Sequence, residues 1–222
     1  FFLWFLTCEL LGVIASLLAW LLTAGGLARQ TFFRLNFALQ RAWGGALFWG
    51  IVRIFNIQLR ITGAQTLSPG RLVVLARHVS SADSLLPTVL ISRVYKTHLR
   101  FVMKDSLLWD PCLDIVGNRL PNSFIKRGKE TRTQAVEQIH QLFDQLGEQE
   151  GVVLFPEGTR FTVSKREKIL QRLKESGEDE AYSQGSALKN VLPPRRAGAL
   201  AALSANPGAD VVFLAHTGLE TV

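Results

Sequence analysis

The chain has 222 residues, enough for one α/β domain with additional elements. Hydrophobic residues make up 48% and the mean hydropathy is +0.19, so the composition favours membrane contact. A net charge of +7 fits a basic surface that meets nucleic acid, anionic lipid or phosphorylated substrates, and the apolar N-terminus favours lipid. The two cysteines, Cys8 and Cys112, argue against a disulfide framework and match no zinc pattern.

Residues 1–24 are apolar apart from Glu9 and a few small polar residues, and they are long enough to span a bilayer as a helix. A signal peptide is the competing interpretation, but no basic segment precedes this stretch and no clear cleavage site follows it. We therefore expect a spanning or deeply embedded helix, with Glu9 near the far interface or facing a partner helix. The basic residues Arg29, Arg34 and Arg41 come next and predict a cytoplasmic position for the following domain.

Residues 42–57 are apolar and aromatic, and Arg41 and Arg60 border them. They predict either an interfacial or re-entrant helix or a core helix of the globular domain, with equal weight. We divide the chain into a membrane-anchoring helical segment at 1–57 and a globular domain at 58–222. The chain begins without Met and stops just after an apolar run, so we expect that pieces are missing at both ends.

From residue 58 onward, short apolar runs alternate with segments of helical periodicity, which predicts an α/β fold with a mostly parallel sheet flanked by helices. Residues 165–184 have low hydrophobicity and are the best candidate for a mobile insertion. Strands are expected at 58–62, 72–76, 99–103 and 152–155, a short strand or extended loop at 123–126, a final buried strand at 209–215, and helices at 83–94, 131–146 and 163–176.

Polar residues follow two of these strands. The segment Arg77–Asp83 comes after the strand at 72–76, and it contains His78 and Asp83. An imidazole can remove a proton from a hydroxyl when a carboxylate on its other nitrogen fixes the tautomer and stabilises the imidazolium. The alternative is a structural histidine beside a capping box, in which Asp83 only begins a helix. Both interpretations are compatible, because the helix start would itself position the pair.

The second segment, Pro156–Arg160, follows the strand at 152–155. Arg160 at the mouth of a sheet is suited to a bidentate contact with phosphate, and Gly158 would let a substrate approach the backbone. The alternative is an ordinary turn with Glu157 paired to Arg160. In a third segment, Lys126 and Arg127 offer a second cationic contact, or else a solvated basic turn.

Taken together, His78-x4-Asp83, Phe124-Ile-Lys-Arg-Gly128 and Phe155-Pro-Glu-Gly-Thr-Arg160 resemble the motifs of the glycerolipid acyltransferases. More narrowly, they resemble the 1-acylglycerol-3-phosphate (lysophosphatidic acid) acyltransferase superfamily. The order and rough spacing match, and the resemblance covers most of the chain from about residue 58, which makes 58–222 the expected acyltransferase domain.

The resemblance implies that His78 is the general base on the acceptor hydroxyl and that Asp83 orients and stabilises it. The hydroxyl would attack an acyl thioester, from acyl-CoA or acyl carrier protein, without an acyl-enzyme. It also implies acceptor-phosphate contacts from Lys126, Arg127 and Arg160 and an acceptor pocket shaped by Glu157, Gly158 and Thr159. The expected product is phosphatidic acid. No metal, other cofactor or nucleic acid is implied, and the expected location is the cytoplasmic face of a bacterial inner membrane or the endoplasmic reticulum.

The chain departs from the family pattern at two places. Arg77 stands where the family often has Asn before the histidine, which would alter the turn or add a phosphate contact. The last expected strand leads into Ala215-His-Thr-Gly218 without the usual Pro, and His216 is expected to be structural or to approach the site. Basic residues of 163–176 predict either lipid contact or a solvated helix: Lys165, Arg166, Lys168, Arg172 and Lys174.

Three other functions compete with acyl transfer to lysophosphatidic acid. One is acyl transfer to another lyso-lipid. A hydrolase is disfavoured because the chain lacks Gly-x-Ser-x-Gly and a Cys–His arrangement. A non-enzymatic basic protein that binds membranes would explain the charge and the apolar N-terminus, but it gives no reason for His78 and Asp83 to accompany Pro156–Arg160.

Overall fold

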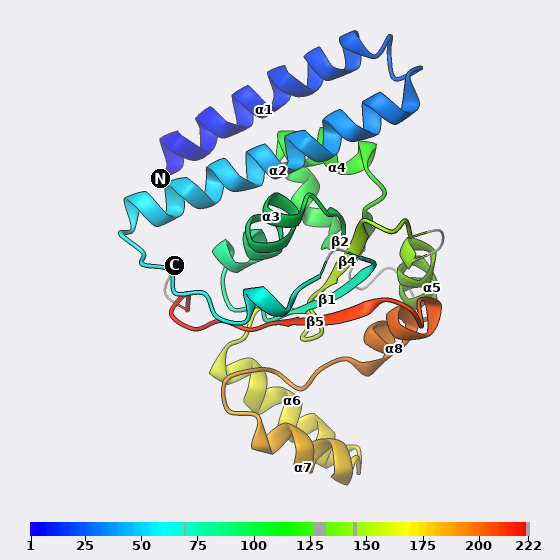
Figure 1. Ribbon diagram of the computed structural model, residues 1–222. Coiled ribbons are helices and arrows are strands. Elements are labelled where there is room, and N and C mark those ends of the chain that lie inside the picture. The colour runs from blue at the N-terminus through cyan, green and yellow to red at the C-terminus, as the bar shows by residue number, and fades with distance from the viewer. Residues whose placement is uncertain (69, 127–131, 144–145, 221–222) are drawn as a thin grey trace.

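The computed structural model describes residues 1–68, 70–126, 132–143 and 146–220. A β-sheet carries helices on both faces, and two long N-terminal helices lie beyond one of these faces (Figure 1). The strands are β1 (Leu72–Ala76), β2 (His98–Lys104), β3 (Ser123–Ile125), β4 (Glu150–Leu154) and β5 (Asp210–Leu214). The helices are α1 (Phe2–Leu22), α2 (Arg29–Ile54), α3 (Arg93–Tyr95), α4 (Pro111–Arg119), α5 (Arg132–Phe143), α6 (Val163–Glu175), α7 (Asp179–Ala187) and α8 (Arg196–Ala205), with short helical turns η1 (Ala64–Thr66), η2 (Ala82–Leu85), η3 (Thr88–Ser92) and η4 (Asp105–Trp109).

The described strands form one parallel sheet in the order β3-β2-β4-β1-β5. Leu72 of β1 is opposite Gly151 of β4 on one side and Asp210 of β5 on the other. Although β2 and β3 separate β1 from β4 along the sequence, β1 and β4 are neighbours in the sheet. Their carboxyl ends therefore meet at one edge, where ligands of open α/β sheets usually bind. The predicted α/β fold with a parallel sheet is confirmed.

The central strands are apolar on both faces because helices cover both faces. Val73 and Val152 point to one side and pack against Phe143 of α5, which is 1% exposed. Val74 and Leu99 point to the other side, where η3 covers them. Full burial of such a side chain contributes roughly 1.5–3 kcal/mol, so these two layers fix the sheet on which the polar loops are mounted.

Two strand predictions need correction. Residues 58–62 form no strand, because they are exposed and no neighbouring strand pairs with them within the described chain. β5 forms as predicted, but it is an edge strand and is not buried, since Val211 is 41% exposed and Phe213 is 78% exposed. Alternating or apolar runs identify a strand only when another strand is available beside them.

The helix predictions were partly right. α5 and α6 lie close to their expected ranges, whereas 83–94 is divided into η2, η3 and α3. Pro87 lies between η2 and η3, and its missing N–H prevents one continuous α-helix. The sequence did not predict α4, α7 or α8, and the predicted aromatic segment at 42–57 is the second half of the longer α2.

Among the described residues, α1 is the helix with the length and apolar composition to cross a membrane. It packs antiparallel against α2 and also contacts α4 (Figure 1). Its buried face is small or polar and includes Cys8, Glu9, Gly12, Ser16 and Ala19. Its large side chains face outward, where they form an extensive apolar surface: Leu3, Leu6, Leu10, Leu11, Ile14, Leu17, Leu18, Leu21 and Leu22.

Polar contacts fix the middle of α1 to the globular domain. The Glu9 carboxylate accepts hydrogen bonds from Trp43 Nε1 of α2 at 2.9 Å and from the Cys112 backbone N–H of α4 at 3.0 Å. Farther along, Arg119 Nη1 donates to Ser16 O at 2.8 Å and to Ser16 Oγ at 2.5 Å. Of the two expected positions for Glu9, the structure has the one that faces a partner helix.

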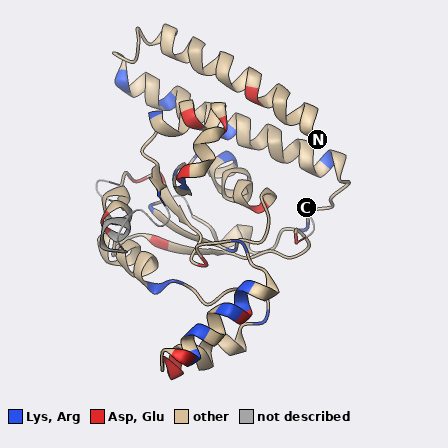
Figure 2. Cartoon of the chain, turned by 180° about the vertical axis from the view of Figure 1, so that it is seen from behind, with Lys and Arg blue, Asp and Glu red and all other residues tan. Residues whose placement is uncertain are grey.

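α6 and α7 form a helical pair that projects from the body of the protein, with basic residues along α6 (Figure 2). Arg166 joins the pair by donating to Leu188 O at 2.6 Å and Ser186 O at 2.8 Å. Lys168, Arg172 and Lys174 are exposed on α6. The segment predicted as a candidate mobile insertion is therefore largely helical.

The contact between α1 and α4 predicts a sensitive position at Gly12. A Cβ atom there would lie 2.4 Å from Cys112 Sγ and 3.2 Å from Trp43 Cδ1. We expect Gly12→Leu to lower the free energy of unfolding by about 1–3 kcal/mol, the usual effect of overpacking, and to expose α1 to protease. Denaturant unfolding and limited proteolysis measure both effects. Thr7→Leu, on the exposed face of α1, is the control. Equal unfolding free energies and equal protease sensitivity of the two variants would contradict this packing.

Candidate active site

The site lies where β1 and β4 end. The turn that follows β1 contains His78 and continues into η2, whose first turn contains Asp83. The turn that follows β4 contains Glu157 and Arg160. The β1–β4 pairing brings these two turns together, and Phe161 N donates to His78 O at 2.8 Å between them.

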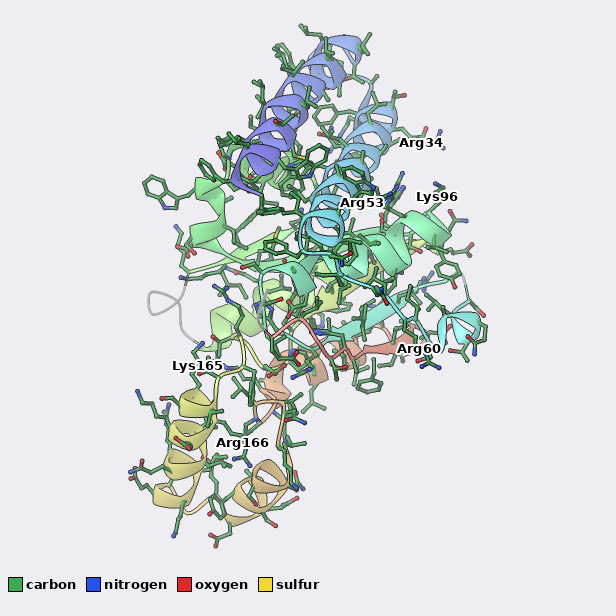
Figure 3. The ribbon with its side chains drawn as sticks, turned by 90° about the vertical axis from the view of Figure 1, so that its left-hand side faces the viewer. Arg34, Arg53, Arg60, Lys96, Lys165 and Arg166 are labelled. Carbon is green, nitrogen blue, oxygen red and sulfur yellow. The ribbon has the colours of Figure 1, made fainter. Side chains whose placement is uncertain are left out.

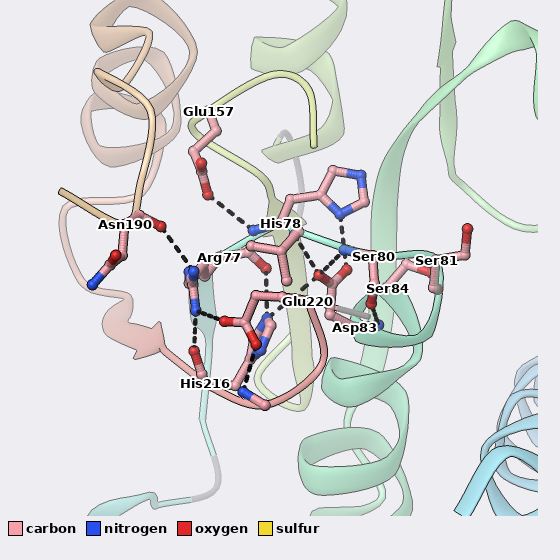
Figure 4. Close-up of polar contacts among 12 residues, drawn as sticks. Arg77, His78, Ser80, Ser81, Asp83, Ser84, Glu157, Asn190, His216 and Glu220 are labelled. Carbon is pink, nitrogen blue, oxygen red and sulfur yellow. Dashed lines mark hydrogen bonds and ion pairs between the residues drawn. The ribbon is translucent and has the colours of Figure 1, made fainter. Parts of the chain in front are cut away.

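His78 and Asp83 form a hydrogen-bonded pair (Figure 4). His78 Nδ1 lies 2.8 Å from Asp83 Oδ1. The His78 side chain is 22% exposed, whereas the Asp83 side chain is fully buried. The second ring nitrogen points away from the carboxylate (Figure 4). With Nδ1–H donating to Asp83, this Nε2 atom is the one that can accept a proton from another molecule.

Asp83 also organises the backbone of its own turn. Its Oδ2 atom accepts hydrogen bonds from Val79 N at 2.5 Å and Ser80 N at 2.7 Å. Ser80 Oγ in turn accepts from Asp83 N at 3.2 Å, which gives the reciprocal pattern of a capping box. The capping geometry and the His78–Asp83 contact are therefore present at the same time.

A second histidine approaches the same carboxylate. His216, in the segment after β5, places Nε2 3.4 Å from Asp83 Oδ2. Burial raises the pKa of Asp83, but hydrogen bonding to His216, His78 and the Ser80 and Val79 backbone lowers it well below its ordinary value. Asp83 is therefore ionised over the whole physiological pH range. The sequence named His216 as a residue that could approach the site, and the adjacency of β5 to β1 explains why it does.

Arg77 contacts the C-terminal segment. It donates to Asn190 O at 2.8 Å, to His216 O and to Glu220 Oε1 at 3.0 Å. These three partners lie far from Arg77 in sequence, and they hold the loops after α7 and β5 against the β1 turn (Figure 4). Of the two effects that the sequence suggested for Arg77, shaping the local structure is the one that these contacts support.

Glu157 is buried and connects the turn after β1 to the loop after α7. It is 5% exposed, and its two oxygens accept from His78 N at 2.9 Å and from Leu192 N at 2.8 Å. The expected alternative, an ion pair with Arg160, is absent from the described contacts of these two residues. Gly158, next in the turn, donates its N–H to Phe155 O at 2.8 Å.

Arg160 lies beside the histidine turn. Its Nη1 donates to Ser81 Oγ at 3.0 Å, and the contact is exposed. The next segment supplies Lys165, whose Nζ donates to Thr159 Oγ1 at 3.1 Å and to Arg160 O at 3.0 Å. The sequence treated Lys165 as a lipid-facing or solvated residue and gave no signal for this contact, which depends on how α6 begins.

The remaining predicted cations lie elsewhere or outside the described chain. Lys126 is exposed just after β3, at the same edge of the sheet but separated from β4 by β2. Within the described residues, no hydrogen bond or ion pair joins Lys126 to either turn. Arg127 lies outside the described residues. The part of the chain that the structure describes contains no cluster of three or more His, Cys, Asp or Glu side chains suited to a metal ion.

The fold and the site are those of an α/β enzyme domain that presents a histidine–carboxylate pair and a neighbouring arginine at the carboxyl edge of a parallel sheet. The sequence model of the Acyltransferase family matches residues 58–204. The chain belongs to this acyltransferase family.

A mouse protein named 1-acyl-sn-glycerol-3-phosphate acyltransferase epsilon (Mus musculus) is 27% identical over 142 residues. The match covers 63% of this chain and 38% of the mouse protein. The chain thus spans well under half the length of this relative. No solved structure matches the chain significantly.

The ionised state of Asp83 predicts a pH-dependent stability. A carboxyl whose pKa is lowered by folding stabilises the protein above its unfolded pKa of about 4, and this contribution is lost as the pH falls through the folded pKa. At pH 7 we expect Asp83→Asn to lower the free energy of unfolding by about 1.5–3 kcal/mol, the loss of hydrogen bonds to a charged group. Chemical unfolding in detergent from pH 7 downward measures the difference from wild type.

The difference in the free energy of unfolding between wild type and Asp83→Asn should stay constant down to about pH 4 and become smaller in stronger acid. The exposed Asp179→Asn serves as the matched control, and it should show little difference at any pH. A gap for Asp83→Asn that widened in acid would contradict the ionised carboxylate.

Proposed function

We propose that the chain moves a fatty acyl group from an acyl thioester to the free hydroxyl of a lysophospholipid, with 1-acylglycerol-3-phosphate as acceptor and phosphatidic acid as product. The observation that carries the proposal is the 2.8 Å contact between His78 Nδ1 and Asp83 Oδ1 beside Arg160. The name of the mouse relative supports the choice of acceptor. Another lyso-lipid acceptor is the alternative that keeps the same chemistry.

In the proposed reaction, His78 Nε2 takes the proton of the acceptor hydroxyl as its oxygen attacks the thioester carbonyl carbon. The carbon–sulfur bond then breaks, and the leaving thiolate receives the proton from the imidazolium. The ionised Asp83 stabilises the imidazolium between these two steps. No acyl-enzyme forms, so the reaction requires no serine or cysteine nucleophile. It also requires no metal or other cofactor, and either acyl-CoA or acyl carrier protein would serve as donor.

Arg160 is the proposed ligand of the acceptor phosphate. Its exposed guanidinium lies next to the turn that holds His78, so a phosphate bound there would place the rest of a lysolipid near the imidazole. Lys126 and Arg127 are proposed to add positive charge along the same edge of the sheet. The proposed pocket residues are Glu157, Gly158 and Thr159, and Glu157 joins their turn to the turn after β1 by accepting from His78 N.

The hairpin of α1 and α2 is the proposed membrane anchor. The side chains on the outward face of α1 are large and apolar, whereas those on its buried face are small or polar. This arrangement is the reverse of that in a helix exposed to water. α4 packs against the middle of α1 and carries the charged residues Asp114 and Arg119. If α1 crossed the bilayer perpendicular to its plane, these charged residues of α4 would lie inside the bilayer. We therefore propose that the hairpin lies embedded in one leaflet, with the site facing the cytoplasm.

His78→Ala tests the proposed base. We expect kcat for acyl transfer from acyl-CoA to lysophosphatidic acid to fall by roughly 10²–10⁴-fold, the usual contribution of a positioned general base. The assay compares wild type and variant in detergent, and unfolding curves establish that both are folded. The His78 ring packs against the partly buried Phe155, and the two ring centroids are 4.7 Å apart. Retained turnover in the folded variant would remove His78 from the role of general base.

Arg160→Gln tests the phosphate contact. Loss of a charge-assisted hydrogen bond should raise the KM for lysophosphatidic acid by roughly 10–100-fold, equivalent to about 1.5–3 kcal/mol. The KM for acyl-CoA should stay within a few-fold. Arg172→Gln, on the exposed part of α6, removes the same charge outside the site and provides the control. An unchanged KM for the acceptor in Arg160→Gln would remove Arg160 from this role.

A further inference from the structure

A cationic pocket lies between α2 and the segment around α3, away from the candidate active site. The pocket has a volume of about 270 Å³ and is lined by Ala38, Arg41, Ala42, Arg93 and Lys96. α3 and Lys96 precede β2, so the pocket is at the amino end of that strand. His78 and Arg160 follow the carboxyl ends of β1 and β4. This pocket is therefore separate from the candidate active site.

The pocket exists because the residues on this face of α2 have small side chains or none. Ala38, Ala42 and Gly45 follow one another at helical spacing. The Arg93 side chain lies across Gly45, where an added Cβ would be 2.4 Å from Nη1 and 2.8 Å from Cζ. Small residues thus leave a hollow on α2 and allow an arginine from the neighbouring segment to form its wall.

The three cations that line the pocket lack acidic partners. Within the described chain, Arg41, Arg93 and Lys96 make no ion pair, and no carboxylate is among the lining residues. The Nη1 atom of Arg41 is buried and has no hydrogen-bond partner there. A buried donor without an acceptor is rare in native proteins, and gathering like charges without compensation is unfavourable. An anion in the pocket would compensate the gathered positive charge.

Further positive charge lies near the pocket. Arg34, about two turns before Arg41 on α2, projects on the same side of the molecule as Lys96 (Figure 3). Burial and the charge of Arg41 lower the pKa of His98, the charge of Glu150 raises it, and Arg34 lowers it, with a net shift downward that disfavours the charged form of this histidine. The anion would therefore be held by arginine and lysine side chains, which suit phosphate oxygens.

The position on α2 indicates the source of the phosphate. Two turns beyond Ala42, Trp49 is 51% exposed, and Arg53 lies over its ring at 5.7 Å. An exposed tryptophan with an arginine beside it is typical of a helix at the membrane interface. The pocket shares this helix with the apolar α1–α2 hairpin, so it would be at the level of the lipid phosphates. Basic pockets of this kind, next to membrane helices, are suited to anionic head groups.

We propose that the pocket formed by Arg41, Arg93 and Lys96 binds the phosphate group of an anionic phospholipid. The bound lipid would fix the orientation of the domain on the membrane. The inference rests on the proposed membrane contact of the hairpin and is independent of the catalytic roles of His78 and Arg160. The test of this inference measures lipid binding alone, so a negative result would not contradict the proposed reaction.

The experiment measures partitioning of the full chain onto phosphatidylcholine vesicles with and without phosphatidylglycerol, a phosphate diester that is neither substrate nor product of the proposed reaction. We expect Arg93→Gln with Lys96→Gln to lower the partition coefficient on the anionic vesicles by roughly 30-fold, at about 1 kcal/mol per cation and tenfold per 1.4 kcal/mol. Ala42→Leu keeps the charge but fills the hollow, and it should weaken the same binding.

The matched control is Arg60→Gln with Arg71→Gln, which removes two exposed arginines outside the pocket. It should change partitioning by no more than a few-fold. Circular dichroism and thermal unfolding confirm that each variant is folded. Equal losses in the pocket and control variants, or no effect of Ala42→Leu, would overturn the pocket as a site.

A second arm separates lipid from free phosphate. Wild type in detergent is heated with inorganic phosphate or with sodium chloride at equal ionic strength. We expect the same unfolding midpoint in both solutions, since the pocket is proposed to take the phosphate of a lipid in the interface. A midpoint that rises with phosphate in wild type, but not in Ala42→Leu, would assign the pocket to a soluble phosphate and overturn the lipid assignment.

Discussion

The buried carboxylate of Asp83 is the group on which the arrangement of the site depends. One oxygen contacts His78 Nδ1, and the other accepts the Val79 and Ser80 N–H groups and lies near His216. An ionised carboxylate inside a protein is unfavourable unless such donors surround it. These donors therefore have to be held in place, and the neighbouring loops serve that purpose. Glu157 holds the His78 backbone, and Arg77 holds the segment that contains His216.

Local chemistry along the chain predicted some of this arrangement. The spacing of His78 and Asp83 across a strand-to-helix turn was enough to predict their contact, because the capping geometry is local. The strands β1 and β4 were predictable for a similar reason, since each contains a short, continuous apolar run, and β2 was predicted although Arg100 interrupts its apolar residues. The segment at 58–62 alternates between polar and apolar residues instead, and within the described chain no strand pairs with it. An alternating pattern alone therefore does not establish a strand.

The contacts that depend on strand order were beyond the sequence. The hydrogen bond between Glu157 and His78 N requires β1 and β4 to be neighbours, although two strands lie between them in the chain. The approach of His216 to Asp83 requires β5 to lie on the other side of β1. Lys165 reaches the Arg160 turn only because α6 begins directly after it. Roles for Lys126 and Arg127 stay predictions. Lys126 follows β3, which is separated from β1 by β2 and β4, and Arg127 lies outside the described residues.

The central claim is that Asp83 holds His78 in the tautomer that acts as a base, and Asp83→Asn tests it most directly. An asparagine amide facing Nδ1 would favour the tautomer with its proton on Nε2, which cannot accept a proton from the acceptor. The measurement is kcat and KM for acyl transfer from acyl-CoA to lysophosphatidic acid, for folded variant and wild type. The account predicts a fall in kcat of roughly 10²–10⁴-fold with both KM values within a few-fold. A kcat close to that of wild type would contradict it.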